Sequence, residues 1–129
     1  FTNNSERLRI DANGTLHAKS DILAFSTTPS DRRLKQNICD ITSSLSEICK
    51  LQGVQYNWKH RSKLLQTGLI AQDVEKIFPN AIKESELPLF ANDNNLYKTI
   101  QYDQLIPHLI ESIKELKSEI EELKTKLKD

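Results

Sequence analysis

The C-terminal part of the chain repeats its apolar residues with a period of seven. From Tyr102 onward, every heptad carries two apolar positions, the first filled by Ile106, Ile113, Ile120 and Leu127 and the second by Leu109, Leu116 and Leu123. Lysine, glutamate and serine occupy the flanks. This spacing predicts a helix that joins copies of itself in a coiled coil. An amphipathic helix packed on its own domain is the alternative.

Other residues of the same segment refine this prediction. Pro107 must lie near the helix start, because deeper inside it would clash with the carbonyl of Asp103. Glu119 suits Lys124 of a partner helix that runs in the same direction. Isoleucine at the first core position with leucine at the second is by itself the preference of two-stranded coils, so the heptads alone do not specify a trimer.

Residues 1–29 alternate apolar and polar positions as short strands do. The alternating apolar positions are Leu8, Ile10, Leu16 and Ala18, and Asn13-Gly14 between the two pairs is a hairpin turn signal. An isolated two-stranded hairpin is marginally stable in water. We therefore expect residues 1–29 to be the end of a larger β-rich stem that lies upstream.

Residues 30–101 mix helical and strand patterns, which predicts a small α+β module. Ile41, Leu45, Ile48 and Cys49 recur at helical spacing, which predicts one short helix. Nearby serines and a threonine could cap its start, and Gly53 could end it. Alternation then predicts a strand over Val54, Tyr56 and Trp58.

The second half of this module repeats the mixture. Leu69–Ala71 is another apolar run, and a helical turn that ends at Pro79 is predicted for Val74, Ile77 and Phe78. Asn92–Asn95 is a polar loop before the strand-like residues 97–100, which predicts a hairpin whose first arm lies near Ala81 and Ile82. The chain thus divides into a stem end (1–29), an α+β module (30–101) and a coiled-coil helix (102–129).

Composition narrows the function classes. Eighteen basic residues balance eighteen acidic ones, so no overall field favours nucleic acid or an anionic membrane. No apolar run has the length of a membrane span, and residues 1–10 lack the pattern of a secretion signal. The hydrophobic content of 37% limits the core of a single copy, which favours association.

Metal and cofactor sites are not indicated. Cys39 and Cys49 have no Cys or His at ligand spacing, so we expect buried or idle thiols in a reducing compartment and no metal site. The chain's three glycines lie far apart, so it has no phosphate-binding glycine loop and we expect no cofactor. The three histidines, His17, His60 and His108, are scattered, and we interpret them as surface or structural residues.

The candidate catalytic residues lie in Ser30-Asp31-Arg32-Arg33-Leu34-Lys35, at the junction of the stem end and the α+β module. A serine hydroxyl becomes a strong nucleophile when a neighbouring base takes its proton, and a lysine does so only as a neutral amine. Nearby positive charge and burial both favour the neutral amine. A turn or helix cap with solvated basic residues is the alternative interpretation of the same stretch.

Three segments together resemble the chaperone-of-endosialidase family, the C-terminal module of phage endosialidases, tail spikes, L-shaped fibres and neck appendages that is also present in myelin regulatory factor. In order along the chain they are Ser30-Asp31-Arg32-Arg33-Leu34-Lys35, Thr67-Gly68-Leu69-Ile70-Ala71-Gln72-Asp73-Val74-Glu75 and Tyr102-Asp103-Gln104-Leu105-Ile106-Pro107. The resemblance extends over about residues 29–127.

This resemblance implies an intramolecular chaperone that assembles its upstream β-rich stem into a parallel homotrimer and then cuts itself off between Pro29 and Ser30. Ser30 would be the nucleophile and Lys35 the general base, while Asp31 would orient Lys35 or an arginine. Arg32 and Arg33 would supply positive charge. The implied setting is the bacterial host cytoplasm during phage assembly, as the precursor of a virion tail or appendage protein.

Two other functions compete with this interpretation. A structural trimerisation cap that never cuts would keep the coiled coil and leave Ser30 and Lys35 idle. A receptor- or sugar-binding tip would need aromatic residues in the loops, and those near Gln66 and Asn92 carry almost none.

The remaining notable residues have structural explanations. We interpret the polar residues of 68–75 as caps of a short helix, and Gly68 as a site of close backbone approach. Tyr56 and Trp58 are best explained as core and subunit-contact residues.

Overall fold

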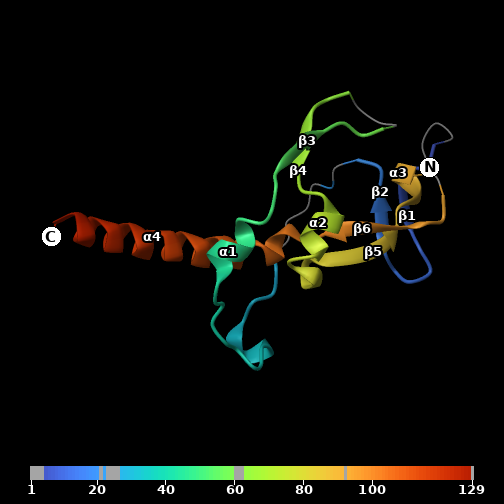
Figure 1. The fold of residues 1–129 in the computed structure, drawn as a ribbon. Helices are drawn as coiled ribbons and strands as arrows, with labels where there is room; N and C mark the ends of the chain where they lie inside the picture. The colour runs from blue at the N-terminus through green and yellow to red at the C-terminus, as the bar shows by residue number, and fades with distance from the viewer. Residues whose placement is uncertain (1–4, 21, 23–26, 60–62, 92, 129) are drawn as a thin grey trace. The chain divides into compact units, whose positions relative to one another are not determined.

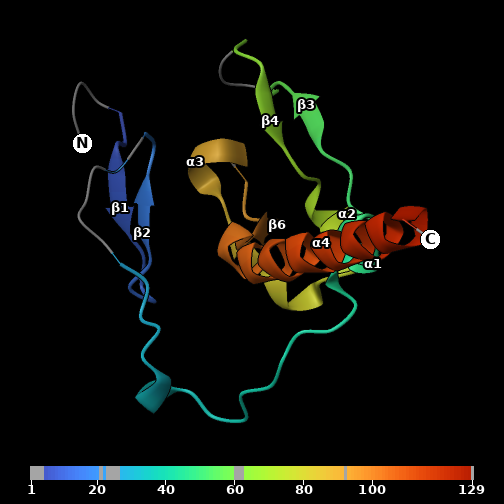
Figure 2. The same cartoon turned by 90° about the vertical axis from the view of Figure 1, so that its left-hand side faces the viewer.

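The computed structural model describes residues 5–20, 22, 27–59, 63–91 and 93–128, which form two units. Phe1–Ile38 and Glu86–Leu96 make up the first unit, and Cys39–Ser85 and Tyr97–Asp129 the second. Figures 1 and 2 label their helices and strands. The elements confirm the predicted small mixed α/β fold with a long C-terminal helix.

The first unit contains the predicted N-terminal hairpin. Strands β1 (Leu8–Ile10) and β2 (Leu16–Ala18) are antiparallel, with Arg9 opposite His17. Gly14 in the turn has a φ of +82°, which glycine adopts without steric strain. The hairpin signal of the sequence is therefore confirmed.

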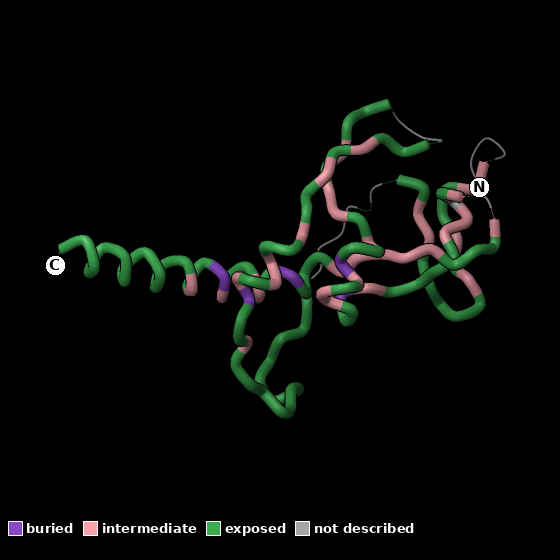
Figure 3. The backbone as a smooth tube through the Cα atoms, viewed as in Figure 1, coloured by how far each residue is buried: buried purple, intermediate pink, exposed green. Residues whose placement is uncertain are grey.

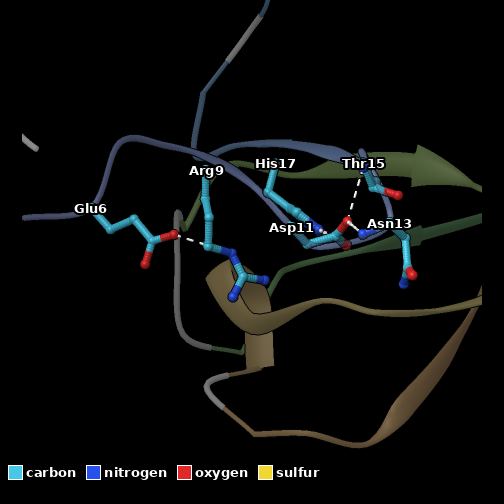
Figure 4. A network of polar contacts seen from close by, with 6 residues as sticks. All are labelled: Glu6, Arg9, Asp11, Asn13, Thr15 and His17. Carbon is cyan, nitrogen blue, oxygen red and sulfur yellow. Dashed lines mark hydrogen bonds and ion pairs between the residues drawn. The ribbon is translucent and has the colours of Figure 1, made fainter.

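Asp11 closes this hairpin turn with its carboxylate, as Figure 4 shows. Its Oδ1 accepts hydrogen bonds from the backbone N–H groups of Asn13 and Thr15, both at 2.9 Å, and its Oδ2 lies 3.1 Å from Nε2 of His17. The contact with His17, followed by the bond from Thr15, holds the pKa of Asp11 below its usual value. His17 therefore has the structural role expected for it.

The second unit begins with α1 (Ser44–Ile48), followed by the antiparallel strands β3 (Val54–Tyr56) and β4 (Gln66–Gly68). The short helix before Gly53 and the strand from Val54 are confirmed. Trp58 lies just past β3 and is 43% exposed, with its ring edge-on to Tyr56 at 5.2 Å.

The middle of the chain forms a series of short elements: α2 (Ala71–Glu75), η2 (Pro79–Ala81), β5 (Ile82–Glu86), α3 (Pro88–Ala91) and β6 (Leu96–Ile100). Strands β5 and β6 pair, as the predicted hairpin requires. The apolar run Leu69–Ala71 is not a strand, because β4 ends at Gly68 and Ala71 already belongs to α2. Helix α3 was not predicted from the sequence.

The hydrophobic core is small. Its buried residues are Val74, Ala81 and Leu105, with Leu51, Leu69, Phe78, Ile82 and Ile100 packed around them. Figure 3 shows how few buried positions the backbone carries among the residues it describes. Many large apolar side chains therefore stay exposed in a single chain, above all along the C-terminal helix.

The chain ends in η3 (Tyr102–Gln104) and α4 (Ile106–Lys128), the long helix of Figure 1. Pro107 is the second residue of α4, where its missing N–H disrupts no intrahelical hydrogen bond. The predicted position of Pro107 near the helix start is confirmed.

Candidate functional site

A single turn of 3-10 helix, η1 (Arg32–Leu34), organises the junction motif. Asp31 precedes the turn, and its Oδ1 accepts a hydrogen bond of 2.8 Å from the backbone N–H of Arg33. The backbone N–H of Lys35 donates to the carbonyl of Arg32 at 3.1 Å. Asp31 is a residue type that favours such caps, which explains why the chain turns here.

This turn brings Ser30 and Lys35 together. Nζ of Lys35 donates a hydrogen bond to Oγ of Ser30 at 2.7 Å. Both residues are exposed, as is Pro29 before them. The two groups named as nucleophile and base are thus in direct contact, in a segment that water reaches freely within one chain.

The Asp31 carboxylate is hydrogen-bonded to Arg33 and not to Lys35. Nε of Arg33 donates to Oδ1 of Asp31 at 3.1 Å, and Nη2 donates to Oδ2 at 2.9 Å. The Arg33 side chain is the main reason that the pKa of Asp31 lies below its usual value, and Asp31 in turn raises the pKa of Arg33. Of the two roles left open for Asp31, this geometry supports the orientation of an arginine.

The seven residues predicted for the coiled-coil core all lie exposed on α4. Their exposed fractions range from 44% at Leu116 to 86% at Leu127. A stripe of exposed isoleucine and leucine along a helix of 23 residues is unusual for a surface that stays in water. We call it the heptad stripe.

A different face of α4 packs against α1 of the same unit. The carboxylate of Glu115 accepts hydrogen bonds from the backbone N–H groups of Ser44 at 2.9 Å and Leu45 at 3.3 Å. Oγ of Ser44, which is fully buried, lies 3.2 Å from Nδ1 of His108. One face of α4 therefore packs on its own unit, as in the alternative interpretation, while the heptad stripe remains exposed and the coiled coil stays a prediction.

Glu115 caps the start of α1, and the sequence did not predict this role. It expected serines and a threonine to cap that helix, but Ser43 makes no side-chain capping bond and Glu115 takes its place. Glu115 lies 71 residues from Ser44, and no local pattern marks such a contact. His108, which also contacts the Phe78 ring at 4.4 Å, is structural as expected.

The second and third family-like segments meet at Tyr102. Its hydroxyl accepts a hydrogen bond of 3.0 Å from the backbone N–H of Leu69. A Cβ on Gly68 would lie only 3.0 Å from that hydroxyl and 3.4 Å from the Tyr56 ring. Gly68 is thus a site of close approach, as predicted, although the group that approaches is a side chain.

The polar residues of 68–75 act differently from the predicted caps. Ile70 precedes α2 and provides no side-chain cap. Glu75 instead accepts a hydrogen bond of 2.6 Å from Nζ of Lys98, which also lies 3.4 Å from Glu84. The bond to Glu75 is the main cause of the raised pKa of Lys98. This ion pair ties α2 to β6.

Other kinds of site find little support among the described residues. Within them, no group of three His, Cys, Asp or Glu side chains is placed to hold a metal ion, and Cys39 and Cys49 are free and exposed. No helix in the described part of the chain has the length and apolarity of a membrane span. His60 lies outside the described residues.

The junction motif and the segment that follows it match a known protein family. A family model described as chaperone of endosialidase matches residues 30–83, beginning at Ser30 itself. The match spans the Ser30–Lys35 turn, α1, β3, β4 and α2.

The chain is also similar to long tail fiber protein Gp37 of several phages. It is 30% identical over 132 residues to the protein of Enterobacteria phage K3, which covers 98% of this chain and 10% of the relative. For Enterobacteria phage T2 the identity is 31%, over 89% of this chain and 9% of the relative. For Enterobacteria phage M1 it is 36%, over 76% and 39%. The chain therefore spans well under half the length of these relatives.

Proposed function

This chain carries a chaperone of endosialidase domain, and on that premise we propose that it trimerises the end of a phage tail fibre, spike or appendage and then releases itself by cutting between Pro29 and Ser30. The main support for the cutting step is the 2.7 Å contact between Lys35 Nζ and Ser30 Oγ. The heptad stripe carries the assembly step.

Assembly begins at the C-terminal end of the polypeptide in this proposal. A parallel coiled coil of three α4 helices buries the heptad stripe and holds three upstream stems close together, at about millimolar effective concentration if the connection acts as a short linker. Pairing of strands from different chains is slow, because loop-closure entropy is lost before contacts form. A C-terminal nucleus reduces that penalty. Similarity to tail fiber proteins supports a fibre as the upstream part.

The cutting step starts from Ser30 and Lys35. Ser30 Oγ attacks the carbonyl carbon of Pro29 while neutral Lys35 accepts the hydroxyl proton. The Pro29–Ser30 peptide bond breaks as Lys35 passes this proton to the departing backbone nitrogen of Ser30, which leaves an ester between Pro29 and Ser30 Oγ. Water then hydrolyses the ester, so the stem ends in the Pro29 carboxylate and Ser30 recovers its hydroxyl.

Trimerisation completes the site in this mechanism. Within one chain, Ser30 and Lys35 are exposed to water, and Lys35 donates a hydrogen bond to Ser30. Burial against neighbouring chains favours the neutral amine, and the positive charge of Arg32 acts in the same direction. Asp31 orients Arg33 and caps the turn that precedes Lys35, without contacting Lys35 itself. Cutting therefore follows assembly, in the host cytoplasm, and leaves a trimer that cannot return by the same pathway.

A second candidate function is a structural cap that trimerises the fibre and is never removed. The exposure of Ser30 and Lys35 in one chain favours it, because an exposed lysine does not readily serve as a base. Both functions use the heptad stripe, so only the fate of the Pro29–Ser30 bond separates them.

Mass spectrometry of the full chain, purified after expression, tests the cutting step. The wild type is expected to give two fragments that separate between Pro29 and Ser30, and Ser30→Ala one intact chain. Thr28→Ala, a nearby exposed hydroxyl, is the matched control and should cut normally. An intact wild-type chain that is trimeric in sedimentation would support the structural cap instead.

A further inference from the structure

An apolar groove lies beside the start of α4, within the second unit. Its volume is about 340 Å³, and the residues that line it are Ile48, Leu51, Leu69, Tyr102, Leu105, Ile106 and Leu109. Helix α1 and the residues after it form one wall, and α4 with the turn before it forms another. The groove is continuous with the heptad stripe, because Ile106 and Leu109 belong to both.

The heptad positions of the lining residues show which side of α4 the groove occupies. With Ile106 at position a and Leu109 at position d, Leu105, one residue before α4 begins and 4% exposed, falls at the flanking position g. The other flanking position, e, does not contribute to the groove. The groove thus opens on the a, d and g side of the helix.

In a parallel coiled coil, position g of one helix faces position e of the next heptad on its neighbour. This rule pairs Glu119 with Lys124 of the neighbour, which are of opposite charge. Applied at the level of the groove, it pairs Leu105 with the neighbour's residue 110, which in this sequence is Ile110. The register that joins the charges therefore also places an isoleucine at the groove.

Ile110 differs from the other residues at position e. Lys117 and Lys124 follow it along the helix, and both suit a solvated flank. Ile110 is apolar and 52% exposed in the single chain. Isoleucine differs from the charged residues, often Glu or Lys, that the flanking positions of a simple coiled coil carry.

We propose that the groove receives Ile110 of a second copy of this chain. The neighbour's side chain would enter between α1 and α4 and contact Leu51 and Leu105. This interlock rests on the proposed trimer and deepens it, because it extends the interface from the helix into the chaperone module. It also sets the register of the helices, together with the Glu119–Lys124 pair.

Sedimentation equilibrium of the full chain tests the interlock. Ile110→Ser removes one buried isoleucine contact per chain, each worth about tenfold in association, so the trimer constant should fall by about a thousandfold. Lys117→Ser, one heptad further at the same position, is the matched control and should change it by less than about tenfold. All measurements use the Ser30→Ala background, so that cutting does not alter the mass.

A double-mutant cycle separates the groove from a general effect of helix packing. Leu51 lines the groove and packs against the core but lies outside the helix, so Leu51→Ala leaves the heptad stripe itself unchanged. Ile110→Ala should lower the association constant less in the Leu51→Ala background than in the wild-type background. The two effects should differ by at least about threefold per contact, which is roughly the lower limit for residues that interact.

The outcomes distinguish this inference from the proposed function. A wild-type chain that stays monomeric at micromolar concentration overturns the trimer and the interlock together. A trimeric wild type with additive effects of Leu51→Ala and Ile110→Ala overturns the interlock alone, and would mean that the groove holds another occupant, such as an upstream segment of the same polypeptide.

Discussion

The Ser30–Lys35 turn and the start of α4 are organised in opposite ways. The turn contains no buried residue, and its bonds join residues at most five positions apart. The first turns of α4 instead pack against fully buried Ser44 of α1, through contacts that span 64 and 71 residues. Local geometry alone therefore sets up the reactive groups, whereas the assembly helix depends on the tertiary fold.

If the proposed function holds, this difference would explain how cutting waits for assembly. A turn held by short-range bonds forms early, with or without partners, and it places serine beside lysine at once. Its exposure keeps the lysine solvated until neighbouring chains cover it. One chain thus provides the geometry of the site, and in the proposed function the trimer would provide its environment.

The largest expected effect comes from the heptad stripe. Ile113→Asp combined with Ile120→Asp places two carboxylates from each chain in the seam, at several kcal/mol for each unpaired charge. Trimers should disappear at micromolar concentration in analytical ultracentrifugation, and cutting should stop with them. Ser118→Asp combined with Thr125→Asp adds the same charge outside the stripe and should preserve both. Fast cutting by a monomeric variant would contradict the dependence of the site on assembly.

The next effect concerns the base. Lys35→Ala should slow cutting by about 10²- to 10⁴-fold, the usual contribution of a general base. Lys35→Arg should not restore it, since a guanidinium stays protonated and cannot accept the serine proton. A time course by mass spectrometry measures the rate, with Gln36→Ala as the control, and light scattering should find all variants trimeric. Equal rates for wild type and Lys35→Arg would remove Lys35 from the mechanism.

Loss of the long-range cap should have a moderate effect. Glu115→Ala leaves the first N–H groups of α1 without their acceptor, which should lower the free energy of unfolding by about 0.5–2 kcal/mol. Glu122 is exposed and lies one heptad after Glu115, so Glu122→Ala should change the free energy of unfolding little. Denaturant unfolding in the Ser30→Ala background measures both. Equal stabilities for the two variants would show that Glu115 does not cap α1 in solution.

The smallest effect is a pH dependence at Asp31. Because Arg33 lowers its pKa in the folded chain, the carboxylate stabilises the turn at pH values above the usual range of about 4, and this contribution is lost as pH falls through the lowered value. A carboxyl NMR titration should find the midpoint below that range. Arg33→Ala should raise it, and Arg32→Ala should leave it unchanged. A normal midpoint in the wild type would mean that the pair does not form.

The sequence predicted those parts of the site that depend on near neighbours. Ser30, Lys35 and the supporting Asp31 belong to one short motif, and a capped turn is enough to join them. It left open whether Asp31 orients Lys35 or an arginine, since both residue types lie within four positions of Asp31. It also missed Glu115, because capping rules consider only residues beside the helix they cap.

By itself, the sequence determined the hairpin around Gly14, the module of short strands and helices, and the long helix with its heptad stripe, because each follows from a local period or a residue's own backbone preference. Only the tertiary structure decided which face of α4 packs on α1, why a Cβ on Gly68 would crowd the Tyr102 hydroxyl, and where an apolar groove stays open. Such features join residues far apart along the chain, and their positions become fixed only when the core around Val74, Ala81 and Leu105 closes and excludes water.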